Sequence, residues 1–314
     1  MAQGFRYVFG PVASRRLGRS LGVDIIPAKV CTLDCVYCEV GRTTAKTIDR
    51  RPYVPVEAVL AEVEARLGQG VEADFITIAG SGEPTLHSQL GQIIDRIKQV
   101  SRTPVALITN GTLFHRQDVR QDAAKADLVI PTLDAADQPT FEAIHRPHCR
   151  LTLAGVVEGL EAFRSEYKGP IWLEVFLVAD ANTSESHIRS LQALIARIKP
   201  DKIQLNTAVR PTADPCVRRP SSAQLQTIAI QLGRNCEVIA EDSRQAGLPG
   251  SGPGVQDLMA VLSRRPCTLE QLCSDLGVAS DQVATHLEVL VQTRRILAEV
   301  QAGQVIYRTP PRPW

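Results

Sequence analysis

The chain has 314 residues, a formal net charge of +1, and 44% hydrophobic and 22% charged residues, values that are ordinary for a globular protein. This composition excludes a low-complexity chain and a molecule that binds polyanions over its whole surface. No stretch approaches the roughly 20 apolar residues of a membrane helix, and residues 1–9 lack the apolar core of a signal peptide, so we expect a cytoplasmic protein with no membrane partner.

Short apolar runs alternate with amphipathic segments over the first two thirds of the chain. The strand candidates are residues 22–26, 74–79, 105–109, 128–132, 171–178 and 202–205. They are continuous apolar runs, which is typical of strands buried on both faces. The helix candidates 56–67, 90–100 and 186–198 carry apolar residues at helical spacing. This order predicts an α/β fold, a partial (βα)6 barrel with a mainly parallel sheet, whose chemistry lies on the loops after the strands.

A second unit is predicted beyond a segment rich in proline and glycine. Residues 247–254 read Gly-Leu-Pro-Gly-Ser-Gly-Pro-Gly, which is typical of a linker. We therefore expect a core barrel over residues 1–210, an extension and linker over 211–254, and a small C-terminal winged-helix domain over 255–314.

The C-terminal pattern contains three helix candidates and a hairpin. The first spans 255–263, the second follows a cap at Thr268 and ends at Gly277, and the third follows a cap at Ser280. Strands at 296–300 and 305–307 are joined by a turn at Ala302 and Gly303. The third helix of a winged helix often reads DNA. Its exposed positions here would be Asp281, Gln282, Thr285 and His286, with only Arg294 and Arg295 nearby, so we do not expect direct DNA binding.

Three closely spaced cysteines carry the chemistry, in the segment Cys31-Thr-Leu-Asp-Cys35-Val-Tyr-Cys38. Three thiolates can bind three irons of a [4Fe-4S] cluster and leave the fourth iron open, as a catalytic centre requires. A zinc site is the alternative, but no further cysteine or histidine lies within residues 25–54. A second cluster on Cys149, Cys216 and Cys236 is conceivable, although their spacing is wide.

This cysteine spacing, with the aromatic Tyr37 before the third cysteine, resembles the signature loop of the radical S-adenosylmethionine (radical SAM) superfamily. The flanking segments Phe9-Gly-Pro-Val-Ala-Ser-Arg-Arg-Leu-Gly18, Ser20-Leu-Gly-Val-Asp24 and 31–41 resemble its branch of wyosine-synthase-like Fe–S oxidoreductases. The resemblance covers residues 5–210 and implies two cofactors, a [4Fe-4S] cluster and S-adenosyl-L-methionine (SAM).

Polar residues at the ends of the later strands are candidates for binding SAM. Gly80 and Gly82 let the backbone approach a ligand, and Glu83 can accept hydrogen bonds from an ammonium. By resemblance, Glu83 would hold the amino group of SAM, Asp134 would contact its ribose, and Asn206 its adenine. The remaining candidates for the cofactor are Tyr37, Asn110 and Glu174. Asn110, Glu174 and Asn206 fit equally well as satisfied structural polar groups.

Basic residues flank the cysteines and are candidates for the substrate. Arg15 and Arg16 precede the motif, and Arg42, Lys46, Arg50 and Arg51 follow it. If the two segments meet, they form a basic mouth; a solvated surface with scattered charges is the alternative. Arg146, within His145-Arg146-Pro147-His148, is a further candidate to hold an anionic substrate, whereas no carboxylates complete a metal site on the two histidines.

The resemblance implies an oxygen-sensitive enzyme that cleaves SAM reductively and uses a 5′-deoxyadenosyl radical to modify a substrate. An electron donor such as flavodoxin or ferredoxin would be its partner. A tRNA base is one candidate substrate, although no cysteine precedes Cys31 to hold the second cluster of the tricyclic-base enzymes. The alternatives are a peptide substrate held by the winged helix, and a redox-sensing Fe–S regulator that binds DNA.

Overall fold

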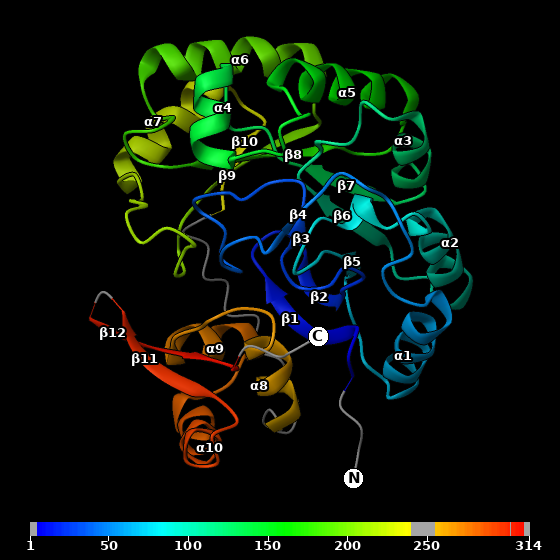
Figure 1. Cartoon of the computed structure of the whole chain (residues 1–314), viewed down its shortest axis with the longest axis vertical. Helices are drawn as coiled ribbons and strands as arrows, with labels where there is room; N and C mark the ends of the chain where they lie inside the picture. Colours follow the sequence, from blue (N-terminus) through cyan, green and yellow to red (C-terminus); the bar gives the residue numbers. More distant parts are fainter. Residues whose placement is uncertain (1–4, 240–254, 302, 311–314) are drawn as a thin grey trace.

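A mainly parallel sheet with helices outside it forms the larger part of the molecule (Figure 1). The computed structural model describes residues 5–239, 255–301 and 303–310. The strands of this part are β1 (Val8–Ser14), β2 (Gly18–Val23), β3 (Val30–Cys31), β4 (Ala45–Lys46), β5 (Phe75–Ile78), β6 (Val105–Thr109), β7 (Leu128–Pro131), β8 (Trp172–Leu177), β9 (Lys202–Thr207) and β10 (Cys236–Val238). One sheet has the order β1-β2-β5-β6-β7 and a second has the order β10-β9-β8. Single bridges from Val129 to Ile171 and from Thr132 to Glu174 connect β7 to β8, so the two sheets continue into one another.

Seven helices follow or connect these strands. They are α1 (Val56–Gly68), α2 (Leu90–Val100), α3 (Gln117–Ala123), α4 (Gln138–His145), α5 (Leu153–Glu166), α6 (Glu185–Ile198) and α7 (Ser222–Leu232). A short 3-10 helix, η1, spans Pro84–Leu86. The α6 sequence shows why they form: Ser184 caps the amide of His187, Ile188 and Leu191 are buried on one face, and Lys199 ends the helix in the left-handed region. The predicted α/β fold with a mostly parallel sheet is confirmed.

The first strand of the sheet differs from the prediction. The structure places it at Gly18–Val23 rather than at 22–26, and pairs it antiparallel with β1, which the sequence analysis did not predict. The register of this pair shifts between Phe9 and Val12. Gly10 and Pro11 lie at that shift. A proline is tolerated there because β1 is an edge strand of the sheet.

The segment between the barrel and the C-terminal unit is in part an extension of the sheet. β10 pairs parallel with β9, and Leu225, Ile228 and Leu232 of α7 join the hydrophobic core of the barrel. The linker predicted at 247–254 lies outside the described residues. None of the helices in the described residues is long and apolar enough to cross a membrane.

The C-terminal unit has a small core of its own. It consists of α8 (Val255–Leu262), α9 (Leu269–Leu276), α10 (Ser280–Gln292), β11 (Leu297–Gln301) and β12 (Gln304–Arg308). Its buried residues include Leu258, Leu272, Leu287 and Ile306. Thr268 caps α9 and Gly277 ends it, as the sequence predicted. The structure adds that Thr268 forms a capping box with Gln271 and that Gly277 has φ +67°. Ser280 is the first residue of α10 rather than its cap, a position that Ala279 takes without a side-chain hydrogen bond.

The C-terminal unit packs against the exposed edge of the sheet. Helices α8 and α9 lie against β1, and Val12 packs on the hydrophobic core of the unit (Figure 1). The Arg264 guanidinium lies 4.1 Å from the centre of the Phe9 ring. The unit therefore covers a strand edge that would otherwise be free to pair with another chain.

Candidate functional site

The cysteine loop, residues 31–41, is held in place on two sides. It begins in β3, which pairs parallel with β4. On one side the amide of Asp34 donates to the carbonyl of His145 at 2.9 Å, at the end of α4. On the other side the amide of Asp214 donates to the carbonyl of Val36, also at 2.9 Å. These contacts fix the backbone of the loop beside the carboxyl ends of the strands.

A side-chain nitrogen lies beside each of the three cysteine sulfurs. Lys29 Nζ lies 3.1 Å from the sulfur of Cys38. Asn110 Nδ2 lies 3.6 Å from the sulfur of Cys31. His145 Nδ1 lies 3.3 Å from the sulfur of Cys35. Nitrogen donors around sulfur stabilise a thiolate, the form that binds a metal.

The three thiols lie close enough together to affect one another. Burial, and after it the charge of Glu83, raise the pKa of Cys31 to about 12. Burial also raises the pKa of Cys35 well above its usual value, and the charges of Cys31 and Cys38 act in the same direction. Without a metal, Cys31 and Cys35 would stay protonated; iron bound there would displace their protons and supply the missing positive charge.

This donor set fits a cluster better than a single metal ion. Among the described residues, no three His, Cys, Asp or Glu side chains are arranged around one ion. A zinc site would require four such ligands at one point. In a [4Fe-4S] cluster each thiolate binds a different iron, so the sulfurs need not converge on one position.

The loop after β5 supports the cysteine loop directly. A Cβ at Gly82 would lie 2.1 Å from the carbonyl oxygen of Val30, so only glycine allows the two loops to approach this closely. The amide of Lys29 donates to the carbonyl of Ser81 at 2.7 Å, and the Ser81 hydroxyl donates to Asp24 at 2.6 Å. A Cβ at Gly80 would lie 3.1 Å from Asp24. The close approach at Gly82 is therefore made by the chain's own backbone.

Glu83 is buried, with 2% of its surface exposed. Its carboxylate accepts hydrogen bonds from the hydroxyls of Thr85 at 2.6 Å and Thr109 at 2.5 Å, and from the amide of Asn110 at 2.8 Å. Burial raises the pKa of Glu83, although these hydrogen bonds oppose the effect. The Asn110 side chain in turn donates to Thr32 at 2.8 Å. Glu83 and Asn110 thus join the ends of β5 and β6 to the start of the cysteine loop.

Asp134 and Tyr37 form a second buried group. Asp134 has no exposed surface, and it accepts a hydrogen bond from the Tyr37 hydroxyl at 2.6 Å. Its other oxygen contacts His145 Nε2. The Tyr37 ring stacks on Phe176 with 3.9 Å between the ring centres. Asp134 therefore connects through His145 to the sulfur of Cys35, and a ribose contact by Asp134 stays a prediction that would require one of these partners to move.

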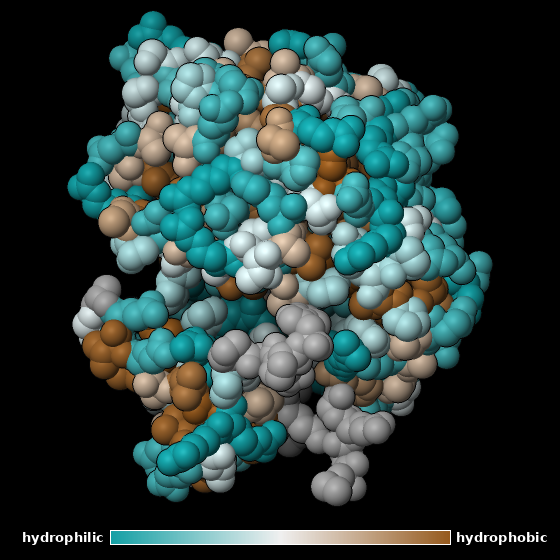
Figure 2. All heavy atoms as spheres, viewed as in Figure 1, coloured by the Kyte–Doolittle hydropathy of each residue, from teal (hydrophilic) through white to brown (hydrophobic). Residues whose placement is uncertain are grey.

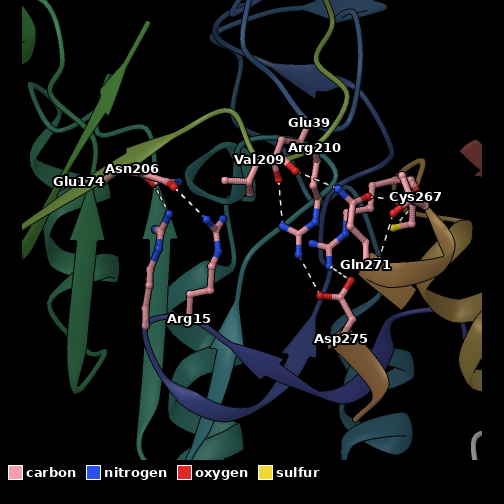
Figure 3. A network of polar contacts seen from close by, with 12 residues as sticks. Arg15, Glu39, Glu174, Asn206, Val209, Arg210, Cys267, Gln271 and Asp275 are labelled. Carbon is pink, nitrogen blue, oxygen red and sulfur yellow. Dashed lines mark hydrogen bonds and ion pairs between the residues drawn. The ribbon is translucent and has the colours of Figure 1, made fainter. Parts of the chain in front are cut away.

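The two arginines that precede the cysteines, which are candidates for a basic mouth, have partners within the protein. Arg16 is ion-paired with Glu174, and Asn206 donates to the same carboxylate at 2.9 Å. Arg15 donates to Asn206 at 3.1 Å, and Figure 3 shows it extending from the turn between β1 and β2 toward β9. These contacts hold both side chains beside Glu174 and Asn206, and a role of Arg15 and Arg16 in a basic mouth that binds the substrate stays a prediction.

Arg146 and Arg50 are also engaged. Arg146 donates to Asp214 at 2.9 Å, which places it beside the cysteine loop. Arg50 is almost enclosed and pairs with Asp118 and Asp122. Of the basic residues after the cysteines, Arg42, Lys46 and Arg51 are exposed.

The structure therefore brings together two groups of predicted residues. Around the cysteine loop lie Cys31, Cys35, Cys38, Tyr37, Gly80, Gly82, Glu83, Asn110 and Asp134. Arg15, Arg16, Glu174 and Asn206 form the other group. Lys29 and His145 contact the cysteine sulfurs, and sequence reasoning did not assign them that position, because nothing in a local pattern pairs His145 with a residue so distant in the chain.

A comparison with known families agrees with this loop and fold. Residues 25–190 match the radical SAM superfamily. The chain belongs to this superfamily, and it is an enzyme of the radical SAM class. Such enzymes use a [4Fe-4S] cluster and SAM as cofactors, and they need a reductant.

Similar proteins give a narrower family. The chain is 39% identical to a UPF0026 protein of Methanocaldococcus jannaschii, over 95% of this chain and 94% of that protein. It therefore belongs to the UPF0026 family. It is also 35% identical to the GTPase Obg of Brachyspira hyodysenteriae over 96% of this chain, but it spans only 45% of that protein's length. The fold is similar to that of TYW1 with a lysine–pyruvate adduct bound, with a TM-score of 0.53, 19% identity, and coverage of 68% of this chain and 72% of that one.

Proposed function

We propose that the protein cleaves SAM reductively at a [4Fe-4S] cluster held by Cys31, Cys35 and Cys38, and that it modifies a substrate with the resulting radical. The observation that carries this proposal is that one loop presents three cysteine sulfurs, each beside a side-chain nitrogen: Lys29 Nζ, Asn110 Nδ2 or His145 Nδ1. When bound, the cluster supplies one electron to SAM, which gives methionine and a 5′-deoxyadenosyl radical.

The chain's own residues would orient these groups. Lys29 and Asn110 would donate to the sulfurs of Cys38 and Cys31, and such donors influence the reduction potential of a cluster. His145, which Asp134 orients, would lie beside the sulfur of Cys35. Gly80, Gly82 and Glu83 would lie along the amino acid part of SAM, and Asp134, Glu174 and Asn206 along its nucleoside. The electron would come from a small carrier such as flavodoxin or ferredoxin.

We propose a tRNA base as the substrate to test first. Arg42, Lys46 and Arg51 are exposed at or close behind the cysteine loop and would contribute favourable charge to a phosphate backbone. RNA that copurifies with the protein under native conditions and is released by ribonuclease would support this choice. A protein free of RNA that cleaves SAM faster in the presence of a peptide would contradict it.

We propose that the C-terminal unit is a winged helix that does not bind DNA directly. Three helices followed by a β-hairpin agree with that architecture. The exposed positions of α10 include Asp281 and Glu288 and no lysine or arginine. Val289, Val300 and Val305 are exposed on the same unit, and apolar atoms gather there in Figure 2. This surface does not favour phosphate binding.

The proposed reaction is tested under anaerobic conditions. The protein is reconstituted with iron and sulfide, reduced, mixed with SAM, and assayed for 5′-deoxyadenosine by mass spectrometry. We expect product from the wild type and from Cys216→Ala, which removes an exposed cysteine outside the loop, and none from Cys35→Ala. A wild type that holds a complete cluster and gives no 5′-deoxyadenosine with several reductants would refute the proposal.

A further inference from the structure

Arg15 has fewer partners than a half-buried cation requires. Among the described residues it makes one hydrogen bond, from Nη1 to the neutral side chain of Asn206 at 3.1 Å, and no ion pair. Its other side-chain nitrogens have no hydrogen-bond partner among the described residues and are not completely buried. A guanidinium has five N–H groups, and a partly buried one is stabilised by several acceptors or by an acid.

The acids near Arg15 already have other partners. Glu174 is ion-paired with Arg16. Glu39 is ion-paired with Arg210 at 3.1 Å through Oε2, and its Oε1 is buried without a hydrogen-bond partner among the described residues. Figure 3 shows this pair on the side of Arg15 away from Glu174. Arg15 therefore lies between two arginines, each of which has its own carboxylate, and has no carboxylate itself.

The surroundings of Arg15 disfavour its charge in the absence of a ligand. Burial lowers the pKa of Arg15 to about 10, and the charges of Arg210 and Arg16 act in the same direction against Glu39 and Glu174. An anion beside Arg15 would offset both effects. The position is suited to a reactant, because Asn206 is at the carboxyl end of β9 and Glu39 directly follows Cys38.

We propose that Arg15 binds an oxyanion, a phosphate or carboxylate, that the substrate carries to the carboxyl end of β9 beside the cysteine loop. The planar fork of a guanidinium matches two oxygens of either group. This inference rests on the proposed function, and it narrows the substrate to an anionic molecule. It assigns the contact to Arg15 alone, because Arg16 and Arg210 already have acidic partners.

The test measures anion binding without turnover. The reconstituted protein, saturated with SAM under anaerobic conditions, is titrated with inorganic phosphate in a calorimeter, and chloride keeps the ionic strength constant. Arg15→Gln should weaken phosphate binding at least about tenfold, the effect of losing one or two charged hydrogen bonds. Arg15→Lys should lose less, because it keeps the charge. Arg19→Gln is the matched control: it removes an arginine of β2 that pairs with the exposed Glu72, and it should bind phosphate as the wild type does.

Two results would overturn the inference. In the first, Arg15→Gln binds phosphate as tightly as the wild type. In the second, Arg15→Gln weakens the binding of SAM itself, measured without phosphate, by tenfold or more; the anion at Arg15 is then the carboxylate of SAM. Phosphate binding that depends on Arg15, in a wild type that cleaves no SAM, would refute the proposed function and leave the anion site standing. If the wild type cleaves SAM but its affinity for phosphate does not depend on Arg15, the anion site is refuted and the proposed function stands.

Discussion

Asp275 of α9 joins the C-terminal unit to the cysteine loop, and its replacement by asparagine is a sharp test of that connection. Its carboxylate accepts from Arg210 at 2.9 Å and from Arg265 at 2.5 Å. The other terminal nitrogen of the Arg210 guanidinium, Nη1, donates to Glu39 in the cysteine loop. Figure 3 shows this run of charges between α9 and the loop. Asp275→Asn removes the negative charge between two arginines and keeps the size of the side chain.

The size of the effect follows from the burial of these side chains. The side chain of Asp275 is 4% exposed, that of Arg210 is 13% and that of Arg265 is 26%. Removal of one partner of a buried ion pair costs about 3–5 kcal/mol. We expect a value near the lower end, about 3 kcal/mol, because Arg210 keeps Glu39 and Arg265 reaches solvent. Such a change corresponds to local opening that is roughly 100-fold more frequent.

Hydrogen exchange followed by mass spectrometry measures that opening segment by segment. In Asp275→Asn, the amides of α9 should exchange roughly 100-fold faster, and those of residues 35–41 should also exchange faster. Glu288→Gln is the control, because it removes an exposed acid from α10 of the same unit. Unchanged exchange in α9 would refute the estimate of the ion-pair energy. Faster exchange in α9 with unchanged exchange in residues 35–41 would refute the connection to the cysteine loop.

Three further substitutions test the supports of the site. Gly82→Ala should lower the iron and sulfide content after reconstitution, because the new Cβ would collide with the carbonyl of Val30; an unchanged iron content would contradict this. Tyr37→Phe keeps the ring and deprives Asp134 of a donor, so the free energy of unfolding in urea should fall by about 1–3 kcal/mol; a smaller loss than about 0.5 kcal/mol would contradict the role of this hydrogen bond. Burial raises the pKa of Asp24 above its unfolded value, so its carboxylate destabilises the fold at neutral pH. Asp24→Asn should therefore be more stable than the wild type at about pH 8, and this difference should shrink as the pH falls through the folded pKa; a difference that does not change with pH would contradict the argument.

The sequence predicted those parts of the fold that local patterns specify. Residues 90–100 show why: apolar side chains at helical spacing can be buried only on one face, and the helix α2 has these bounds. The capping box at Thr268 and the left-handed glycine at Gly277 are likewise local signals. The edge strand β1 was missed because Gly10 and Pro11 interrupt its pattern, and only pairing with β2 makes that interruption tolerable.

The partners of the charged residues could not be predicted in the same way. Arg15 and Asn206 are separated by 191 residues, and Cys35 and His145 by 110. A local charge pattern says that an arginine needs an acceptor but does not identify the acceptor. The three cysteines differ in this respect, because their close spacing within one loop limits how far apart their sulfurs can lie. The sequence therefore predicts the chemistry that the cysteine loop supports. It does not predict which distant side chains surround the loop.

The two attachments of the C-terminal unit differ in chemistry, and the difference indicates what each contributes. At β1 the contact includes apolar packing, because Val12 lies against the hydrophobic core of the unit, and the Arg264 guanidinium lies over the Phe9 ring. The burial of apolar surface stabilises association directly. At the cysteine loop the contact is a set of buried charges, whose mutual attraction is largely offset by the loss of hydration. The charged contact therefore adds little to the strength of docking. It adds direction instead, because Arg210 can satisfy Glu39 and Asp275 together only when α9 is correctly placed relative to the residue that follows Cys38. We conclude that the apolar edge holds the unit on the barrel, and that the charges fix its position relative to the cysteine loop.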